Sequence, residues 1–325
     1  MNVLVTYHAG EKERAIYREV LEGVARIRYL HDAGQDERPR LLSQAQVLIA
    51  MSFSHGEIDG TEASLLKNVG LVQLIFAGAD RIPFDLIPEQ AVLASNTGAF
   101  AGPVAEHVLA LTLALAKNLF PRYRLLCEGR FDRDSFNKEL KGGICGIIGF
   151  GGNGRKIGRL MQAMGMKVYG INRGGKTDAP IDFVGTMTHM KMVLQEADVV
   201  VVTTPLTRKT RNMIARDELQ WMKPDAVLIN VGRGDLIDQG ALYEHLKSNP
   251  DFRAGIDTWW REPDHGEDLT LGYPFCELPN FIGSPHNADQ VPGSILRATR
   301  TALKNVKRYL AGEDIHGVVD RDDYL

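Results

Sequence analysis

The sequence predicts an α/β protein with two Rossmann-like or flavodoxin-like parallel-sheet domains and a cleft between them. Three observations favour this class. Apolar runs with the length of buried strands alternate with helical patterns in both halves of the chain, which is typical of parallel sheets covered on both faces. One strand–helix–strand unit contains a glycine-rich turn. The length of 325 residues is sufficient for two cores.

Strands and helices alternate from the first residue to about residue 97. The expected strands are Asn2–Tyr7, Ala25–Tyr29, Val47–Met51, Val72–Phe76 and Val92–Ala94. The expected helices are Glu11–Glu22, Arg38–Ser43 and Gly60–Lys67. Ligands bind beyond the carboxyl ends of parallel strands, so residues 51–54 and the turn at Ala77, Gly78 and Ala79 are candidate ligand loops. The amides of this turn fit a bound carboxylate, and its residues fit an ordinary tight turn equally well.

A long apolar helix is expected between residues 102 and 119. Pro103 suits a first helical position. Apolar side chains cover much of its surface, which indicates burial in a core or against a second subunit. We expect Pro121 to end this helix, and residues 122–141 to form a further helix and a loop.

The glycine-rich unit starts with an apolar strand, Ile144–Ile148, and ends with a second one, Lys167–Ile171. Between them, three glycines at G-x-G-x-x-G spacing precede a helical pattern: Gly149, Gly151 and Gly154. This spacing permits a tight turn, a close backbone approach to a pyrophosphate, and close packing of helix on strand. Helix-start N–H groups then face the anion. A glycine-rich loop without a ligand is the alternative, but the flanking strand and helix favour dinucleotide binding.

The end of the second strand of this unit bears on the cofactor. An NAD site usually has Asp or Glu there, which binds the ribose 2′-OH. This chain has Asn172, followed by Arg173 and, three residues later, Lys176. The two cations favour the 2′-phosphate of NADP(H) over NAD(H), although a solvated basic turn would have the same residues.

Four more apolar runs are expected strands of the second domain: Ala197–Val202, Asp225–Val231, Ala254–Asp257 and Phe281–Gly283. The tail from about residue 290 to residue 311 has a helical pattern. Composition excludes several other classes. The net charge of −3 without a basic block argues against nucleic acid. No basic leader precedes a long apolar run, and the longest apolar segment is too short for a bilayer. Three scattered cysteines outside metal spacing favour a cytoplasmic protein without a metal.

Three ionisable residues lie at or just beyond strand ends of the second domain: Arg233, Glu262 and His286. A bidentate carboxylate ligand would suit Arg233, and an ion pair with Asp235 or Asp238 is the structural alternative. His286 is suited to proton exchange near neutral pH. Glu262 could bond its other ring nitrogen, which would orient the imidazole and stabilise its protonated form.

These residues lie within stretches that resemble the D-isomer-specific 2-hydroxyacid dehydrogenase family over nearly the whole chain. The matching stretches are SNTGAFAGPVAEHVLALTLALAKN (95–118), IIGFGGNG (147–154), PLTRKTRNMI (205–214), INVGRGDLID (229–238), GIDTWWREP (255–263) and SPHNA (284–288). The stretch after His286, NADQVPGS, differs from the usual Gly- and Ala-rich form of the family, and the basic turn after Asn172 resembles its NADP-dependent glyoxylate and hydroxypyruvate reductases.

The resemblance implies a reductase that transfers hydride between NADP(H) and a small 2-oxoacid or D-2-hydroxyacid. Arg233, Glu262 and His286 would be catalytic, and Ala77, Gly78 and Ala79 would bind the substrate carboxylate together with Arg233. The implied cofactor-binding residues are Gly149, Gly151, Gly152, Asn153, Gly154, Asn172, Arg173, Lys176, Thr204, Pro205, Val231 and Asp257, the last beside the nicotinamide.

The resemblance also implies a domain organisation. Residues 1–97 and 288–325 would form the substrate domain, and residues 98–287 the dinucleotide-binding domain. The helix 102–119 would contribute to a homodimer interface. Two other functions keep the same fold: a dinucleotide-sensing protein of the corepressor type, and a formate dehydrogenase. The filled catalytic positions argue against the first, and Glu262 beside an acid histidine fits a 2-oxoacid better than formate.

Overall fold

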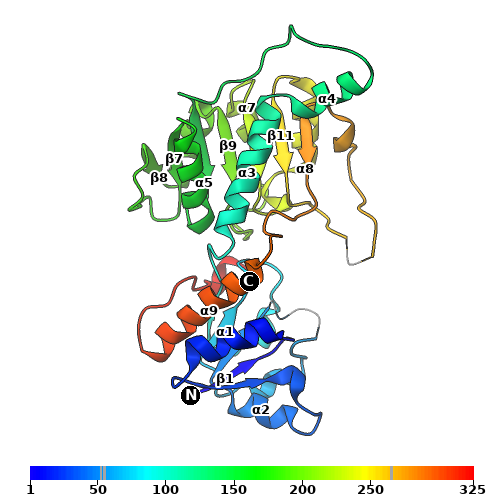
Figure 1. Ribbon diagram of the computed structural model, residues 1–325. Coiled ribbons are helices and arrows are strands. Elements are labelled where there is room, and N and C mark those ends of the chain that lie inside the picture. The colour runs from blue at the N-terminus through cyan, green and yellow to red at the C-terminus, as the bar shows by residue number, and fades with distance from the viewer. Residues whose placement is uncertain (52, 54–55, 264–265) are drawn as a thin grey trace. The chain divides into compact units, whose positions relative to one another are not determined.

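The computed structural model describes residues 1–51, 53, 56–263 and 266–325. The chain divides into two compact units (Figure 1). Unit 1 comprises Met1–Phe100 and Val291–Leu325, and unit 2 comprises Ala101–Gln290. Each unit contains one sheet, and every strand pairing within the two sheets is parallel among the described residues. The predicted class of two parallel-sheet α/β domains is therefore confirmed.

Unit 1 contains a sheet in the order β2-β1-β3-β4-β5. Its strands are β1 Asn2–Val5, β2 Arg26–Tyr29, β3 Val47–Ala50, β4 Leu71–Leu74 and β5 Val92–Ala94. The central strands β3 and β4 are buried along their whole length, as expected for a sheet covered on both faces. All five strands that the sequence predicted are present. Two residues of the candidate loop 51–54, Ser52 and Ser54, lie outside the described part of the chain.

The helices of unit 1 are α1 Glu11–Leu21, α2 Arg38–Gln44 and α9 Ser294–Leu310, with short 3₁₀ turns at Leu30–Asp32, Ala63–Leu65, Phe84–Leu86 and Arg321–Asp323. In Figure 1, α9 lies beside α1, and ion pairing of Arg300 with Glu19 joins the two helices. The C-terminal helix therefore completes the N-terminal unit.

The predicted helix Gly60–Lys67 was wrong, because only the 3₁₀ turn at Ala63–Leu65 forms there. The Asp59 carboxylate accepts the backbone N–H groups of Thr61 and Glu62 at 2.8 and 3.0 Å. Such local bonding favours a tight turn over a longer helix, and the chain then turns directly into β4.

Unit 2 contains a sheet in the order β12-β11-β10-β9-β6-β7-β8. Its strands are β6 Ile144–Ile148, β7 Lys167–Ile171, β8 Phe183–Gly185, β9 Val199–Val202, β10 Val227–Asn230, β11 Arg253–Ile256 and β12 Phe281–Gly283. The chain order reverses beside β6, which lies between β7 and β9. Such a switch point is where doubly wound sheets bind ligands. The short edge strand β8 was not anticipated from the sequence.

The helices of unit 2 are α3 Ala101–Ala116, α4 Leu119–Cys127, α5 Gly152–Ala163, α6 Met190–Glu196, α7 Arg216–Trp221 and α8 Gln239–Ser248, with 3₁₀ turns at Met187–His189, Gly234–Leu236 and Phe275–Glu277. None of the described helices is both long and apolar enough to cross a bilayer.

The predicted helix 102–119 ends earlier than expected, and Pro121 does not end it. Asn118 adopts a left-handed conformation with φ of 49°, which breaks the helical path between α3 and α4. Pro121 then lies within the first turn of α4, where its missing N–H is tolerated. The apolar face of α3 packs inside its own unit. Val108 is fully buried. Leu115 lies close to β11, because a Cβ added at Gly255 of that strand would be 3.2 Å from its side chain.

Candidate active site

The turn between β6 and α5 is shaped by two close backbone approaches. Gly149 has φ of +108°, and a Cβ there would lie 2.6 Å from the carbonyl carbon of Thr203. A Cβ at Gly154 would lie 2.5 Å from the carbonyl oxygen of Gly149. Both positions therefore exclude side chains, as the G-x-G-x-x-G spacing indicates.

Gly151 differs from these two glycines because its ideal Cβ position meets no atom within 4 Å. It is the N-cap of α5, and Gly152 and Asn153 form the first turn of that helix. The first N–H groups of a helix have no partner inside it, and the helix dipole favours an anion there. The turn thus offers open space and N–H donors where a pyrophosphate would fit.

The neighbouring strand ends supply the other expected cofactor residues. Thr204 and Pro205 follow β9, and Val231 follows β10. A Cβ at Gly232 would lie 2.9 Å from the Thr204 carbonyl oxygen, so these two loops touch each other. All three residues therefore lie at the carboxyl edge of the sheet, after β9 next to β6 and after β10 one strand further along.

The loop after β7 is held by Asn172. Its Oδ1 accepts the N–H of Gly175 at 2.7 Å, and its Nδ2 donates to the carbonyl of Lys176 at 2.9 Å. Its backbone N–H donates to Gly185 at 3.0 Å. The exposed side chains of Arg173 and Lys176 stand on the loop that this asparagine shapes. Asn172 therefore holds the loop together at the position where an NAD site usually has a carboxylate.

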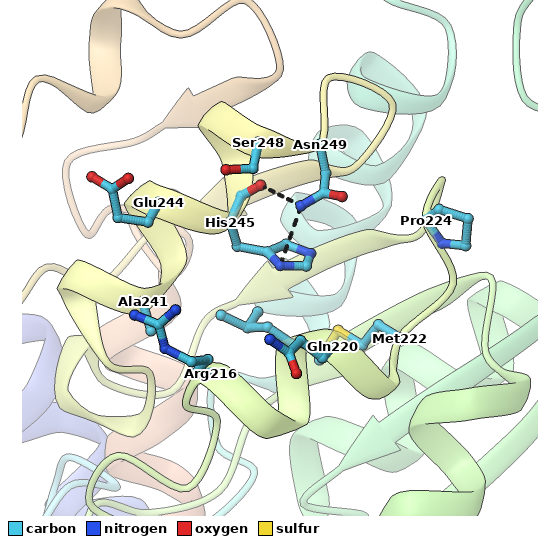
Figure 2. Close-up of a pocket in the computed structure, with 10 residues that line it drawn as sticks. Arg216, Gln220, Met222, Pro224, Ala241, Glu244, His245, Ser248 and Asn249 are labelled. Carbon is cyan, nitrogen blue, oxygen red and sulfur yellow. Dashed lines mark hydrogen bonds between the residues drawn. The ribbon is translucent and has the colours of Figure 1, made fainter.

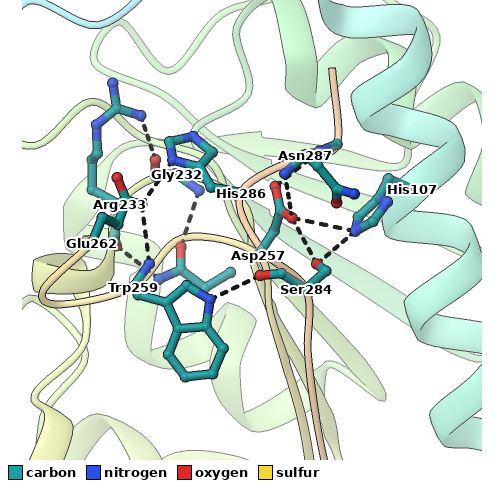
Figure 3. Close-up of polar contacts among 11 residues, drawn as sticks. His107, Gly232, Arg233, Asp257, Trp259, Glu262, Ser284, His286 and Asn287 are labelled. Atoms are coloured by element: carbon teal, nitrogen blue, oxygen red, sulfur yellow. Dashed lines mark hydrogen bonds and ion pairs between the residues drawn. The ribbon is translucent and has the colours of Figure 1, made fainter. Parts of the chain in front are cut away.

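Arg233 stands on a tight loop after β10. The buried side chain of Asn230 organises this loop, because Oδ1 accepts the N–H of Gly232 at 3.0 Å and Nδ2 donates to the Arg233 carbonyl at 2.8 Å. One guanidinium nitrogen of Arg233 donates to the Gly232 carbonyl at 2.8 Å. Figure 3 shows Arg233, Glu262 and His286 in the same region of unit 2.

The two local carboxylates that could have paired with Arg233 bind elsewhere. Asp235 forms an ion pair with Arg211. Asp238 caps α8 by accepting the N–H of Ala241 at 2.7 Å. The printed contacts of these two carboxylates are therefore with other groups.

Glu262 and His286 meet directly. Their Oε1 and Nδ1 atoms lie 2.7 Å apart, with 17% and 40% of the two side chains exposed. The backbone N–H of Trp259 donates to the same Oε1 at 3.3 Å, which orients the carboxylate. A carboxylate on Nδ1 fixes the ring and directs its Nε2 outward, the arrangement expected of an acid–base histidine (Figure 3).

The turn that presents His286 has an unusual backbone. The residue lies in the left-handed region with φ of +50°, a backbone conformation that residues other than glycine rarely adopt. Its N–H donates to the carbonyl of Asp257 at 2.9 Å. The carboxylate of Asp257, buried to 1% exposure, accepts the N–H groups of Asn287 and Ala288 at 3.2 and 3.3 Å. Asp257 therefore holds this turn in place.

Several residues of this cluster were missed in the sequence. His107 Nε2 lies 2.8 Å from Ser284 Oγ, which in turn donates to Asp257 Oδ1 at 2.6 Å. The one sequence signal for His107 is that it is a polar residue within an otherwise apolar helix. Ser284 lies two residues before His286, and no pattern around it indicates a role. Asp289 is a further neighbour: burial raises the pKa of its carboxyl group, and the nearby His286 partly opposes that shift.

The expected substrate loop belongs to unit 1, where Ala77, Gly78 and Ala79 follow β4. Ala77 is exposed, Gly78 is half-buried and Ala79 is buried. Asn96 secures the start of the loop, because its N–H donates to the Phe76 carbonyl at 3.0 Å. The structure thus presents the exposed Ala77 and the half-buried Gly78 in the loop that follows β4.

A cavity of about 570 Å³ lies elsewhere in unit 2, between α7 and α8 (Figure 2). Its lining includes Arg216, Gln220, Glu244, His245 and Asn249. None of the residues singled out in the sequence is among these lining residues. The paired titratable groups lie instead at the strand ends, which makes those ends the candidate site.

Comparison with known proteins bears directly on this geometry. The family model for the NAD-binding domain of D-isomer specific 2-hydroxyacid dehydrogenases matches residues 109–288. The chain belongs to that family. It is therefore an NAD(P)-dependent oxidoreductase, and its unit 2 contains the family's dinucleotide-binding domain.

Individual relatives of this dehydrogenase cover most of its length. The hydroxypyruvate reductase of Thermotoga maritima is 31% identical over 78% of this chain and 80% of its own. The glyoxylate reductase of Thermococcus litoralis is 27% identical over 81% of this chain and 82% of its own. A structure from Pyrobaculum aerophilum, provisionally described as a formate dehydrogenase, has a TM-score of 0.81 at 26% identity and covers 100% of both chains.

Proposed function

We propose that this dehydrogenase reduces a small 2-oxoacid of the glyoxylate or hydroxypyruvate type to the D-2-hydroxyacid, with NADPH as the preferred cofactor. The observation that carries the proposal is the 2.7 Å pair between His286 Nδ1 and Glu262 Oε1. The loop of Arg233 touches the loop of Glu262, because a Cβ at Gly234 would overlap the backbone of Trp259. A guanidinium and a carboxylate-paired imidazole are thus available within one unit.

The side chains have distinct roles in this proposal. Bound NAD(P)H supplies the hydride. Arg233 holds the substrate carboxylate through charge-assisted hydrogen bonds. His286 donates a proton from Nε2 to the oxygen that becomes the hydroxyl group, which is worth about 10²- to 10⁴-fold in rate. Glu262 keeps the ring oriented through its bond to Nδ1.

The cofactor preference rests on the loop after β7. Arg173 and Lys176 supply positive charge, and Asn172 leaves no carboxylate there to repel a 2′-phosphate. Arg155 on the neighbouring helix α5 is paired with Asp178. We expect Arg173→Ala to raise KM for NADPH by about tenfold, the cost of one charged hydrogen bond, with little change for NADH. Arg216→Ala, in the α7–α8 cavity, is the matched control.

A panel of substrates tests the activity. Glyoxylate, hydroxypyruvate, pyruvate, branched 2-oxoacids and formate should be compared with NADPH or NADP⁺ as appropriate. We expect turnover with at least one small 2-oxoacid. Tight dinucleotide binding without any turnover would instead support the corepressor-type function, and formate oxidation would support the third alternative.

A homodimer is also proposed, with an interface different from the one expected. The apolar face of α3 is buried within unit 2, whereas α4 and the segment after it expose large apolar side chains: Leu119, Phe120, Tyr123, Leu126, Phe131 and Phe136. Several large apolar side chains exposed along one segment favour an interaction site, and a second copy of the chain is the commonest partner. Light scattering should show a dimer for the wild type and for Val24→Glu in unit 1. The double variant Phe120→Glu/Leu126→Glu should be a monomer.

A further inference from the structure

Three polar side chains from separate elements meet behind the turn of His286: His107 on α3, Asp257 after β11 and Ser284 after β12 (Figure 3). His107 Nε2 lies 2.8 Å from Ser284 Oγ and 3.5 Å from Asp257 Oδ1. Ser284 Oγ lies 2.6 Å from the same carboxylate oxygen. All three belong to unit 2.

The hydrogen-bond donors in this cluster follow from the chemistry of its members. An ionised carboxylate only accepts, so the hydroxyl proton of Ser284 is directed to Asp257. The hydroxyl oxygen of Ser284 then accepts from His107, which must carry a proton on Nε2. His107 is therefore a donor that orients Ser284 towards Asp257 and places its own N–H group near the carboxylate.

Asp257 transmits this arrangement to His286. Its two carboxylate oxygens also hold the N–H groups of Asn287 and Ala288, the residues that follow His286. The Ser284 carbonyl accepts the N–H of His286 at 3.0 Å and the indole N–H of Trp259 at 2.8 Å. The left-handed conformation of His286 persists because these bonds surround it on both sides.

We propose that His107 is a positioning residue for the reaction: through Ser284 and Asp257 it fixes the turn that aims His286. The proposal rests on the proposed function, in which His286 is the proton donor. His107 acts without touching substrate.

A purely structural role for His107 in holding α3 fits the contacts less well. The helix is anchored by Val108, Leu111 and Leu115, which are nearly or fully buried. The His107 side chain keeps 24% of its surface exposed, so its removal leaves that packing in place. The effect of its loss should therefore fall on the turn at residues 284–288.

Kinetics of full-length variants provide the first test. We expect His107→Ala to lower kcat about tenfold or more, the usual cost of an outer hydrogen-bond partner, with an unchanged KM for the dinucleotide and an unchanged Tm. His107→Gln keeps an N–H donor at this position and should restore kcat to within about threefold. His245→Ala is the matched control, because it removes a half-buried histidine from α8 at the cavity of Figure 2.

Amide hydrogen exchange of the peptide containing residues 286–288 provides a second test that needs no turnover. We expect faster exchange there in His107→Ala and in Ser284→Ala, near-normal exchange in His107→Gln, and no change in β6. If the wild type reduces no 2-oxoacid, the proposed function fails, yet this exchange pattern still decides whether His107 holds the turn.

Two results would overturn the proposal. One is normal exchange at 286–288 in His107→Ala, whatever happens to kcat, because the residue would then not act through the turn. The other is an equal loss of kcat and of Tm in the Ala and Gln variants, which would indicate that the ring contributes only packing to α3.

Discussion

Gly234 and the backbone of Trp259 are in direct van der Waals contact: a Cβ at position 234 would lie 2.3 Å from the carbonyl carbon of Trp259 and 2.4 Å from its oxygen. The contact joins the loop of Arg233 to the loop that leads to Glu262. Any side chain at position 234 must push these two loops apart.

The first prediction concerns this contact. We expect Gly234→Ala to destabilise the protein by about 1–3 kcal/mol, the usual cost of overpacking, and to lower kcat because Arg233 and Glu262 are displaced relative to each other. Urea unfolding and steady-state kinetics measure the two effects. Gly60→Ala, at a position with no atom within 4 Å of the added Cβ, is the control. An active, fully stable Gly234→Ala would show that the two loops are not packed as described.

A second prediction separates binding from stability at Gly151. The added methyl group of Gly151→Ala meets no protein atom within 4 Å, so we expect nearly unchanged stability. It would nevertheless occupy the space at the N-terminus of α5 where a pyrophosphate fits, so dinucleotide affinity should fall by about tenfold or more, the equivalent of 1.4 kcal/mol. Fluorescence titration with NADPH and NADH measures it. Wild-type affinity in this variant would place the pyrophosphate elsewhere.

A third prediction addresses the paired acid. Glu262→Gln retains the size of the side chain but removes the negative charge next to His286 Nδ1. We expect kcat to fall about 10- to 100-fold, and His286→Ala to lower it by about 10²- to 10⁴-fold. Glu244→Gln makes the same substitution at an exposed position on α8 and should have no effect. If His286→Ala reduces the best 2-oxoacid at the normal rate, this histidine is not the proton donor.

The fourth prediction is a pH dependence of stability at Asp198, which lies below the opposite edge of the same sheet. Burial alone would raise the pKa of its carboxyl group, but the N–H of Ile144 and the ammonium groups of Lys223 and Lys138 together lower it. A lowered folded-state pKa contributes stability at pH values above the unfolded-state pKa of about 3.9. That contribution disappears as the pH falls through the folded-state pKa.

Asp198→Asn should therefore be less stable than the wild type at pH 6, by about 1.5–3 kcal/mol for the lost charged hydrogen bonds. The difference should shrink as the pH falls below 4. Urea unfolding across this range measures it, with Asp225→Asn as the control because its carboxylate is half exposed beside Lys138. A constant difference at all pH values would show that the charge of Asp198 is not involved.

Local patterns were sufficient for much of the fold. The strand Ile144–Ile148 and the three glycines after it could be recognised because a buried strand and a tight turn impose their residue types within a few positions. The positions of Arg233 and His286 at strand ends followed in the same way. The helix end at Ala116 could not be predicted, because a single left-handed residue, Asn118, sets it.

By itself, the sequence determined the two-sheet class, the glycine turn and the residue types available for acid–base chemistry, since each depends on residues that are close together in the chain. Only the tertiary structure decided that His107 bonds Ser284, a partner 177 residues away, and that the buried Asp257 holds the turn of His286. Such contacts depend on where a helix and two strands end in space, and no local periodicity encodes the relative positions of those ends.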